Sequence, residues 1–176
     1  MVDLRRRVEE DRGLLKRIQL HIPGFAGYRR KEDLRTADNL LRIQIANKLK
    51  ELKGQLESAR GTLTANYQIK ALEPLGAVIL KAQSLEGQIR HAEQGYSGLV
   101  ADVRVLEPQL NTLYAWDASL LDGVAALSTE ASALDDAASG DGTKVTDRIK
   151  AIQKGLADLE ATFKRRMLVI TGTEAG

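Results

Sequence analysis

The sequence predicts an all-α protein, an elongated antiparallel helical bundle of about five helices with coiled-coil-like packing. Apolar residues recur at alternating steps of four and three, the spacing of a helix that buries one stripe of side chains. The chain has only three prolines, Pro23, Pro74 and Pro108, so the long segments between them are free to be helical. Its apolar residues are mainly aliphatic, with two Phe, four Tyr and one Trp, which suits helix-on-helix packing. We expect one domain over residues 1–176.

The first predicted helix spans roughly residues 2–21, and Asp11 stands where its stripe calls for another apolar residue. It ends at a turn, because Pro23 disfavours helical geometry at Ile22 and because Gly24 and Gly27 permit positive φ. The second predicted helix, residues 29–67, is the longest, at about 55 Å for 1.5 Å per residue. A helix of roughly 30 Å is enough to cross a compact domain, so we expect part of the apolar stripe of this longer helix to face another chain. The stripe comprises Leu34, Ala37, Leu41, Ile45, Leu49, Leu52, Leu56, Ala59 and Leu63.

Three further segments complete the bundle. A helix over roughly 74–94 opens with Pro74 in its first turn, where proline is tolerated, and Gly95 ends it as a left-handed cap. Residues 99–106 form the one strand-like run, interpreted as an extended connector. The helix predicted over 107–139 has the cleanest register, and the last spans 144–170 after a loop at 139–142. The stripe of the first of these helices is Val78, Ala82, Leu85, Ile89 and Ala92. That of the second is Leu106, Leu110, Leu113, Asp117, Leu120, Val124, Leu127, Ala131 and Leu134. That of the last is Val145, Ile149, Ile152, Leu156, Leu159, Phe163 and Ile170.

Composition excludes several kinds of chemistry. The chain has no cysteine, so disulfides, thiolate metal sites and cysteine nucleophiles are ruled out. Its first residues lack the apolar core of a signal peptide, and no window approaches the roughly 18 apolar residues that span a bilayer, so we expect a cytoplasmic protein. Residues 107–142 contain seven acidic residues and no basic one, and we expect this acidic helix to lie beside basic neighbours.

Two glycine-rich turns resemble those of a family of uncharacterised helical proteins from archaea and bacteria. The first is Ile-Pro-Gly-Phe-Ala-Gly-Tyr at residues 22–28, followed by a charged segment to Asp38, and the second is Gly-Tyr-Ser-Gly at 95–98. The resemblance covers about residues 15–125 and implies a helical fold. The resemblance implies no activity and no catalytic residue. The family is associated with membrane-linked stomatin-like proteins, but this association assigns no partner.

These turns allow two interpretations, a recognition surface or a plug for the end of the bundle. In the second, which we favour, the glycines meet the turn geometry while the aromatic residues cover the core. Neither turn matches a phosphate-binding loop. The residues concerned are Pro23, Gly24, Phe25, Gly27, Tyr28, Gly95, Tyr96 and Gly98.

Asp11, Asp38 and Asp117 fall on or beside the apolar stripes, where a carboxylate needs a partner or a raised pKa. One interpretation is a metal-carboxylate enzyme, but such centres use Glu-x-x-His pairs, and the chain has none. We favour the structural alternative, in which each Asp bonds a donor and fixes the register of the helices. For Asp117 we expect the donor to be Arg35 or Arg42. We further expect Asp117→Leu to be tolerated, because it completes an apolar stripe, and Asp117→Ala to cost roughly 1–3 kcal/mol.

Three basic runs lie near predicted helix ends, and they would attract anionic lipid or nucleic acid if they shared one end of the bundle. Solvated surface charge is the simpler interpretation, and the absence of interleaved aromatics disfavours nucleic acid. The runs are Arg5, Arg6 and Arg7; Arg29, Arg30 and Lys31; and Lys164, Arg165 and Arg166.

No motif of nucleophilic or cofactor-dependent catalysis is present in the sequence. We therefore expect no enzyme, no cofactor and no small-molecule substrate. The leading hypothesis is a non-catalytic helical interaction or scaffold protein that acts through protein–protein contacts or self-association. The alternative is a peripheral protein that binds an anionic membrane surface through its basic helix ends.

Overall fold

The computed structural model describes the backbone of residues 4–23, 25, 31–92 and 107–171, and the side chains of residues 13–23, 25, 37–92 and 112–168. Within these ranges the chain forms helices and no strand, which confirms the all-α prediction. Each helix begins and ends within one turn of its predicted bounds. The elements are α1 (Leu4–His21), α2 (Lys31–Ala65), a short 3-10 helix η1 (Ile69–Ala71), α3 (Leu72–His91), α4 (Glu107–Ser139) and α5 (Val145–Thr171).

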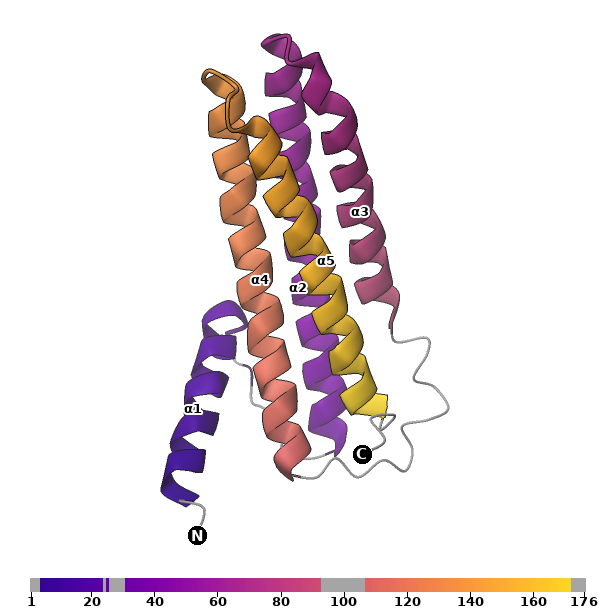
Figure 1. Ribbon diagram of the computed structural model, residues 1–176. Helices are drawn as coiled ribbons and strands as arrows, with labels where there is room; N and C mark the ends of the chain where they lie inside the picture. Colours follow the sequence, from indigo (N-terminus) through magenta and orange to yellow (C-terminus); the bar gives the residue numbers. More distant parts are fainter. Residues whose placement is uncertain (1–3, 24, 26–30, 93–106, 172–176) are drawn as a thin grey trace.

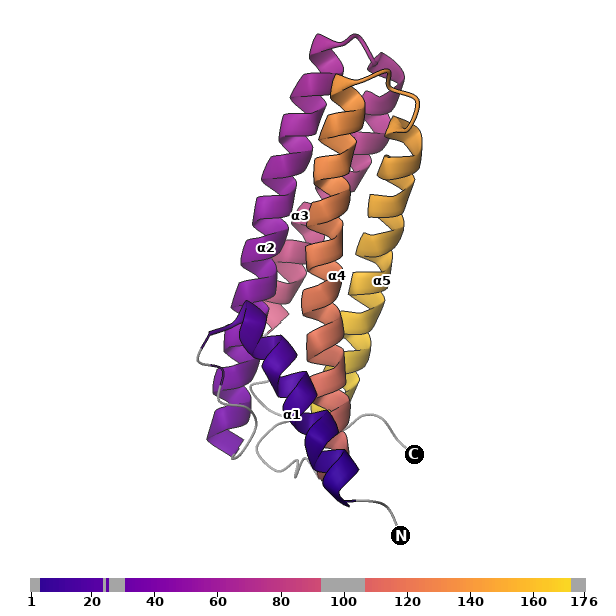
Figure 2. The ribbon, with the colours of Figure 1, turned by 90° about the vertical axis from the view of Figure 1, so that its left-hand side faces the viewer.

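Helices α2 to α5 form a four-helix bundle, and α1 lies on its outside along α4 (Figures 1 and 2). The bundle consists of two antiparallel hairpins, α2–α3 and α4–α5, whose tips lie at the same end. The hairpins pack side by side, so that α2 contacts α4 and α3 contacts α5. Across this junction neighbouring helices run parallel, so the predicted antiparallel packing applies within each hairpin and not between them.

The predicted stripes meet in one continuous core. In α2, every stripe residue from Leu41 to Leu63 is completely buried against helices of the same chain. The expectation that part of this stripe faces a second chain is therefore wrong for these residues. Within the chain this stripe is covered by α3 and α4, both of which pack along α2 (Figure 1). The described stripe residues of α3, α4 and α5 are also buried, from Val78 to Ile89, from Leu113 to Leu134 and from Val145 to Phe163. Ala92, directly after α3, is only partly buried.

The two hairpin tips are joined by side-chain amides. The carbonyl of Ala138, in the last turn of α4, accepts hydrogen bonds from Asn66 Nδ2 at 2.7 Å and Gln68 Nε2 at 3.1 Å. Helix ends leave such carbonyls without helical partners, so the first hairpin caps the second. Gly142 in the opposite tip has a φ of 74°, and a Cβ there would lie 2.8 Å from Gln68 Oε1, so the contact requires glycine.

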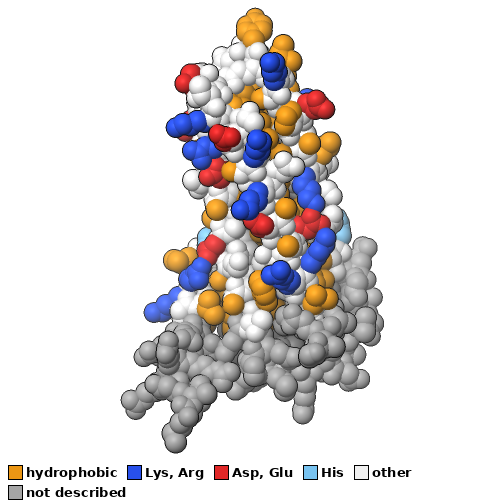
Figure 3. Space-filling view, in the orientation of Figure 1, with side chains coloured by type: hydrophobic (Ala, Val, Ile, Leu, Met, Phe, Trp, Pro, Cys, Tyr) orange, Lys and Arg blue, Asp and Glu red, His pale blue; other side chains and the backbone are white. Residues whose placement is uncertain are grey.

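The surface carries interleaved charges of both signs. On the face shown in Figure 3, Lys and Arg side chains alternate with Asp and Glu along the bundle, with apolar side chains between them. Among the helices that the structure describes, none is both long enough and apolar enough to cross a membrane.

Candidate functional site

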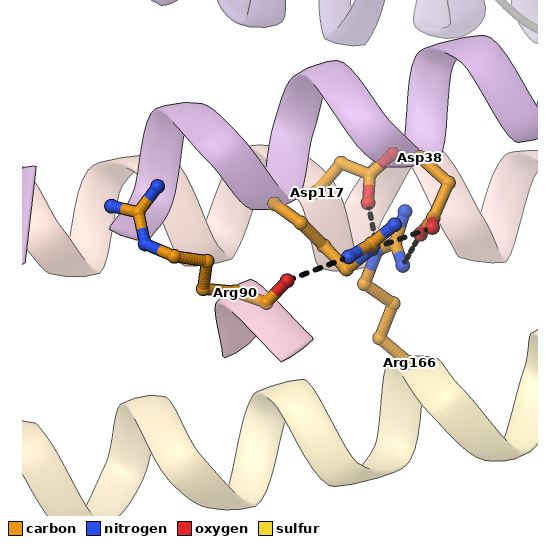
Figure 4. Close-up of polar contacts among 5 residues, drawn as sticks. Asp38, Arg90, Asp117 and Arg166 are labelled. Carbon is orange, nitrogen blue, oxygen red and sulfur yellow. Dashed lines mark hydrogen bonds and ion pairs between the residues drawn. The ribbon is translucent and has the colours of Figure 1, made fainter. Parts of the chain in front are cut away.

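Four charged side chains are buried together inside the bundle: Asp38 and Arg42 of α2, Asp117 of α4 and Arg166 of α5. Asp117 and Arg166 are completely inaccessible to solvent, and Asp38 is 7 % exposed. Figure 4 shows Asp38, Asp117 and Arg166 converging from the three helices, with the carbonyl group of Arg90 approaching from the end of α3. We call this set, including the Arg90 carbonyl, the ionic layer.

The layer is a chain of charge-assisted hydrogen bonds in which Arg166 is the link between α2 and α4. Its Nε donates to Asp117 Oδ1 at 2.5 Å, and its Nη1 donates to Asp38 Oδ1 at 2.6 Å. The other oxygen of Asp38 accepts from Arg42 Nε at 2.8 Å. Arg42 Nη1 in turn donates to the carbonyl oxygen of Arg90 at 3.3 Å. All four helices of the bundle are thereby tied together at one level.

Helical spacing explains why these residues meet. Asp38 and Arg42 are four residues apart, so they lie on one face of α2, and Asp117 lies between Leu113 and Leu120 on the stripe of α4. Arg166 follows Phe163 by three residues and precedes Ile170 by four, so it occupies a stripe position of α5. The sequence thus places each charge in the core by the same periodicity that buries the leucines.

The layer contains two carboxylates and two guanidinium groups, so its formal charges cancel. Removing ions from water is costly, and only close pairing with further hydrogen bonds offsets that cost. The pairing within a buried layer is specific, because a shift of one helix along its neighbours would leave a buried charge without its partner. The best-supported role of these residues is therefore to fix the register of the four helices.

The predicted burial of Asp38 and Asp117 is confirmed, and the side chain of Asp11 lies outside those described. The structure describes Arg166, and not one of the two predicted arginines, as a donor to Asp117. Arg42 belongs to the layer but bonds to Asp38, and the side chain of Arg35 is not among those described. The prediction that Arg166 is part of a basic surface is wrong, since it is fully buried. Its stripe position four residues before Ile170 could have revealed this.

The rest of that basic run does lie at the surface. Lys164 donates to Glu160 Oε1 at 2.8 Å, and the guanidinium carbon of Arg165 lies 5.9 Å from the ring centre of Trp116, within range of a cation–π contact. The Nε1 of Trp116 is buried and has no hydrogen-bond partner among the residues described. The side chains of the remaining basic residues lie outside those described: Arg5, Arg6, Arg7, Arg29, Arg30 and Lys31.

Only part of the predicted turn motif can be located. Phe25 is buried, and its carbonyl oxygen accepts a hydrogen bond from Gln19 Nε2 at 2.9 Å, whereas Pro23 is exposed. For Phe25, this position agrees with the plug interpretation. The other members lie outside the described residues: Gly24, Gly27, Tyr28, Gly95, Tyr96 and Gly98.

The acidic helix α4 has basic neighbours, as expected. Arg17 of α1 forms a salt bridge with Asp122, and Arg148 of α5 donates to Glu130 at 2.8 Å. His21 Nε2 also lies 3.6 Å from Asp122 Oδ1. Within the described ranges, no three His, Asp or Glu side chains are grouped so that they could hold a metal ion.

A scan against protein-family models, a search of curated proteins and a search of solved structures each found no match to this chain. The family resemblance of the two turns therefore stays a prediction.

The structure reverses the expected effect of Asp117→Leu. Removing this carboxylate leaves Arg166 buried with an excess positive charge, so we expect both Asp117→Leu and Asp117→Ala to lose about 3–5 kcal/mol of unfolding free energy. Arg166→Met should cost a similar amount. The double variant Asp117→Leu/Arg166→Met removes both charges and should cost at least about 1 kcal/mol less than the sum of the single changes. Urea denaturation of the four variants measures this coupling, and additive losses would contradict it.

A second prediction concerns Glu160 of α5, which lies between Lys164 of the same helix and Lys81 of α3. Hydrogen bonds from Lys164 and then Lys81 hold the pKa of this carboxyl below its ordinary value of 4.5. The folded protein therefore gains stability from ionised Glu160 above that value and loses it as the pH falls toward the lowered pKa. We expect Glu160→Gln to weaken the pH dependence of the unfolding free energy below about pH 4.5. Unchanged dependence in this variant would refute the assignment.

Proposed function

We propose that this protein is a non-catalytic helical interaction protein that self-associates through the outer face of α2. The observation that carries the proposal is a group of large apolar side chains exposed where α1 meets α2. Leu40 and Ile43 of α2 are 44 % and 39 % exposed, and Leu20 of α1 is 82 % exposed. We call these three residues the junction patch.

Two of the three residues stand next in sequence to a hydrogen bond that joins the two helices. The carbonyl oxygen of His21, next to Leu20, accepts a hydrogen bond from Gln44 Nε2 at 3.2 Å, and Gln44 follows Ile43 directly. Leu40 and Ile43 are three residues apart and so lie on the same side of α2. Grouped exposed apolar side chains are typical of contact surfaces, whereas single ones are common on any protein.

The ionic layer supports the same proposal, because it holds the segment of α2 that displays the patch. Asp38 and Arg42 point into the bundle from the turns whose outer side carries Leu40 and Ile43. A helix whose register is fixed by buried ion pairs presents its outer side chains in one arrangement, which lowers the entropic cost of binding.

We expect the protein to form a dimer or larger assembly and the double variant Leu40→Lys/Ile43→Lys to be monomeric at the same concentration. Two buried ammonium groups at a contact would be strongly unfavourable. Size-exclusion chromatography with light scattering measures the mass, and the matched control is Ile69→Lys/Leu80→Lys, which adds the same charge at two exposed residues elsewhere. A monomeric wild-type protein at micromolar concentrations would overturn the self-association.

A second candidate function is the binding of an anionic membrane surface, and one observation favours it. The N-terminal ends of α1 and α2 and the C-terminal end of α5 lie at the same end of the bundle, opposite the hairpin tips (Figure 1). Arg5, Arg6 and Arg7 of α1, Lys31 of α2 and Lys164 and Arg165 of α5 therefore belong to neighbouring helix ends, the condition under which their attraction to anionic lipid would add. Arg166 does not contribute, because it is buried in the ionic layer.

This candidate predicts that the protein floats with vesicles that contain phosphatidylserine at low salt but not at high salt. The variant Arg5→Gln/Arg6→Gln/Arg7→Gln should lose binding. The control Lys70→Gln/Lys144→Gln/Lys150→Gln, which removes three charges near the hairpin tips, should retain it. Binding that does not depend on lipid charge or on salt would count against the proposal.

A further inference from the structure

A cleft lies between α2 and α3, and neither the ionic layer nor the junction patch accounts for it. Its volume is about 360 Å³, within the range of pockets that hold small molecules. Polar side chains from both helices line it: Asn47, Lys50 and Lys53 of α2, and Gln83, Glu86 and Arg90 of α3.

Arg90 joins the two helices at this cleft. Its Nε donates to Glu86 Oε1 at 2.6 Å, and its Nη2 donates across to Asn47 Oδ1 at 3.0 Å. The guanidinium is thus held in place and its charge is balanced by Glu86. Because Asn47 accepts through its oxygen, its amide nitrogen is left as a donor. The carbonyl of Arg90 belongs to the ionic layer, which anchors this part of the cleft to the core.

The two lysines of the cleft have no such balance. Neither Lys50 nor Lys53 forms a hydrogen bond or a salt bridge with any residue in the described part of the chain. Lys53 is half-buried and Lys50 is exposed, so both can be reached from the cleft. The two residues are three apart and project from the same side of α2, so their charges act on the same space. The cleft therefore has an excess of two positive charges and free amide donors.

We propose that this cleft binds the phosphate group of a small molecule. Lys50 and Lys53 supply the charge for a group that carries nearly two negative charges at neutral pH, and lysine binds phosphate as a point charge. The amide groups of Asn47 and Gln83 contact the remainder of the ligand. The bound molecule bridges α2 and α3, so binding also stabilises the fold.

The test is calorimetric titration of the full chain with pyrophosphate at constant ionic strength. We expect saturable binding by the wild-type protein and at least about tenfold weaker binding by Lys50→Gln/Lys53→Gln, because two charge-assisted contacts are lost. The matched control is Lys48→Gln, since this lysine lies on the same turns of α2 but does not line the cleft. It should bind as the wild type does. Equal affinity in the double variant and the wild type would overturn the proposal.

A second arm identifies the source of the phosphate group. The same proteins are sedimented with vesicles of phosphatidylcholine with and without phosphatidic acid. Binding of pyrophosphate that requires Lys50 and Lys53 assigns the site to a soluble phosphorylated molecule. Binding of the phosphatidic acid vesicles alone, with the same requirement, assigns it to a lipid headgroup. Failure of both probes would refute the site, and neither outcome depends on the junction patch.

Discussion

The rest of the structure depends on the pairing of Arg166 with two carboxylates, Asp117 of α4 and Asp38 of α2, at distances of 2.5 and 2.6 Å. Apolar stripes alone would bring the helices together, because burial of leucines is favourable in many registers and has little directional preference. A buried guanidinium is different, since it must find its acceptors or carry a large desolvation cost. Arg166 therefore selects one register among those that the leucines permit. Arg42 also fixes the position of α3, because its guanidinium donates a hydrogen bond to the carbonyl oxygen of Arg90.

Both proposed surfaces lie on helix segments whose buried side is part of the ionic layer. The junction patch lies on the outside of the turns of α2 that place Asp38 and Arg42 in the core. The phosphate cleft shares Arg90 with the layer, whose backbone carbonyl faces Arg42 while its side chain reaches Glu86 and Asn47. A rigid interior holds the surface side chains in place before binding. Less conformational entropy is then lost when a partner binds, which favours affinity. The two proposals concern ligands of different chemistry, an apolar protein surface and a phosphate group, and separate sets of variants test them.

The charge pattern along the chain has a comparable explanation. Segment 107–142 has no basic residue, and its carboxylates obtain cations from α1 and α5 through Arg17, Arg148 and Arg166. The pairs of Arg17 and Arg148 are partly exposed and so contribute little individually, whereas the pair of Arg166 with Asp117 is fully buried. A similar pairing of opposite charges links α3 and α5, where the carboxylate of Glu160 forms salt bridges with both Lys81 and Lys164.

The sequence by itself determined the helices, their bounds and the residues that fill the core, because the spacing of apolar residues is a local property that each helix expresses alone. It also placed Asp38 and Asp117 inside, since Asp117 falls on an apolar stripe and Asp38 directly beside one, and the neighbouring stripe residues are buried. Only the tertiary structure decided that the hairpins pack with α2 parallel to α4, that the stripe of α2 is covered within the chain, and that Arg166 meets Asp117. These outcomes depend on which helices become neighbours. Arg166 is 49 positions from Asp117 and 128 from Asp38, and nothing in a single sequence indicates that residues so far apart are paired. Arg166 looked like one of three basic surface residues because its run of charges is conspicuous. Its position on the stripe of α5 became decisive only when carboxylates on two other helices lay within reach.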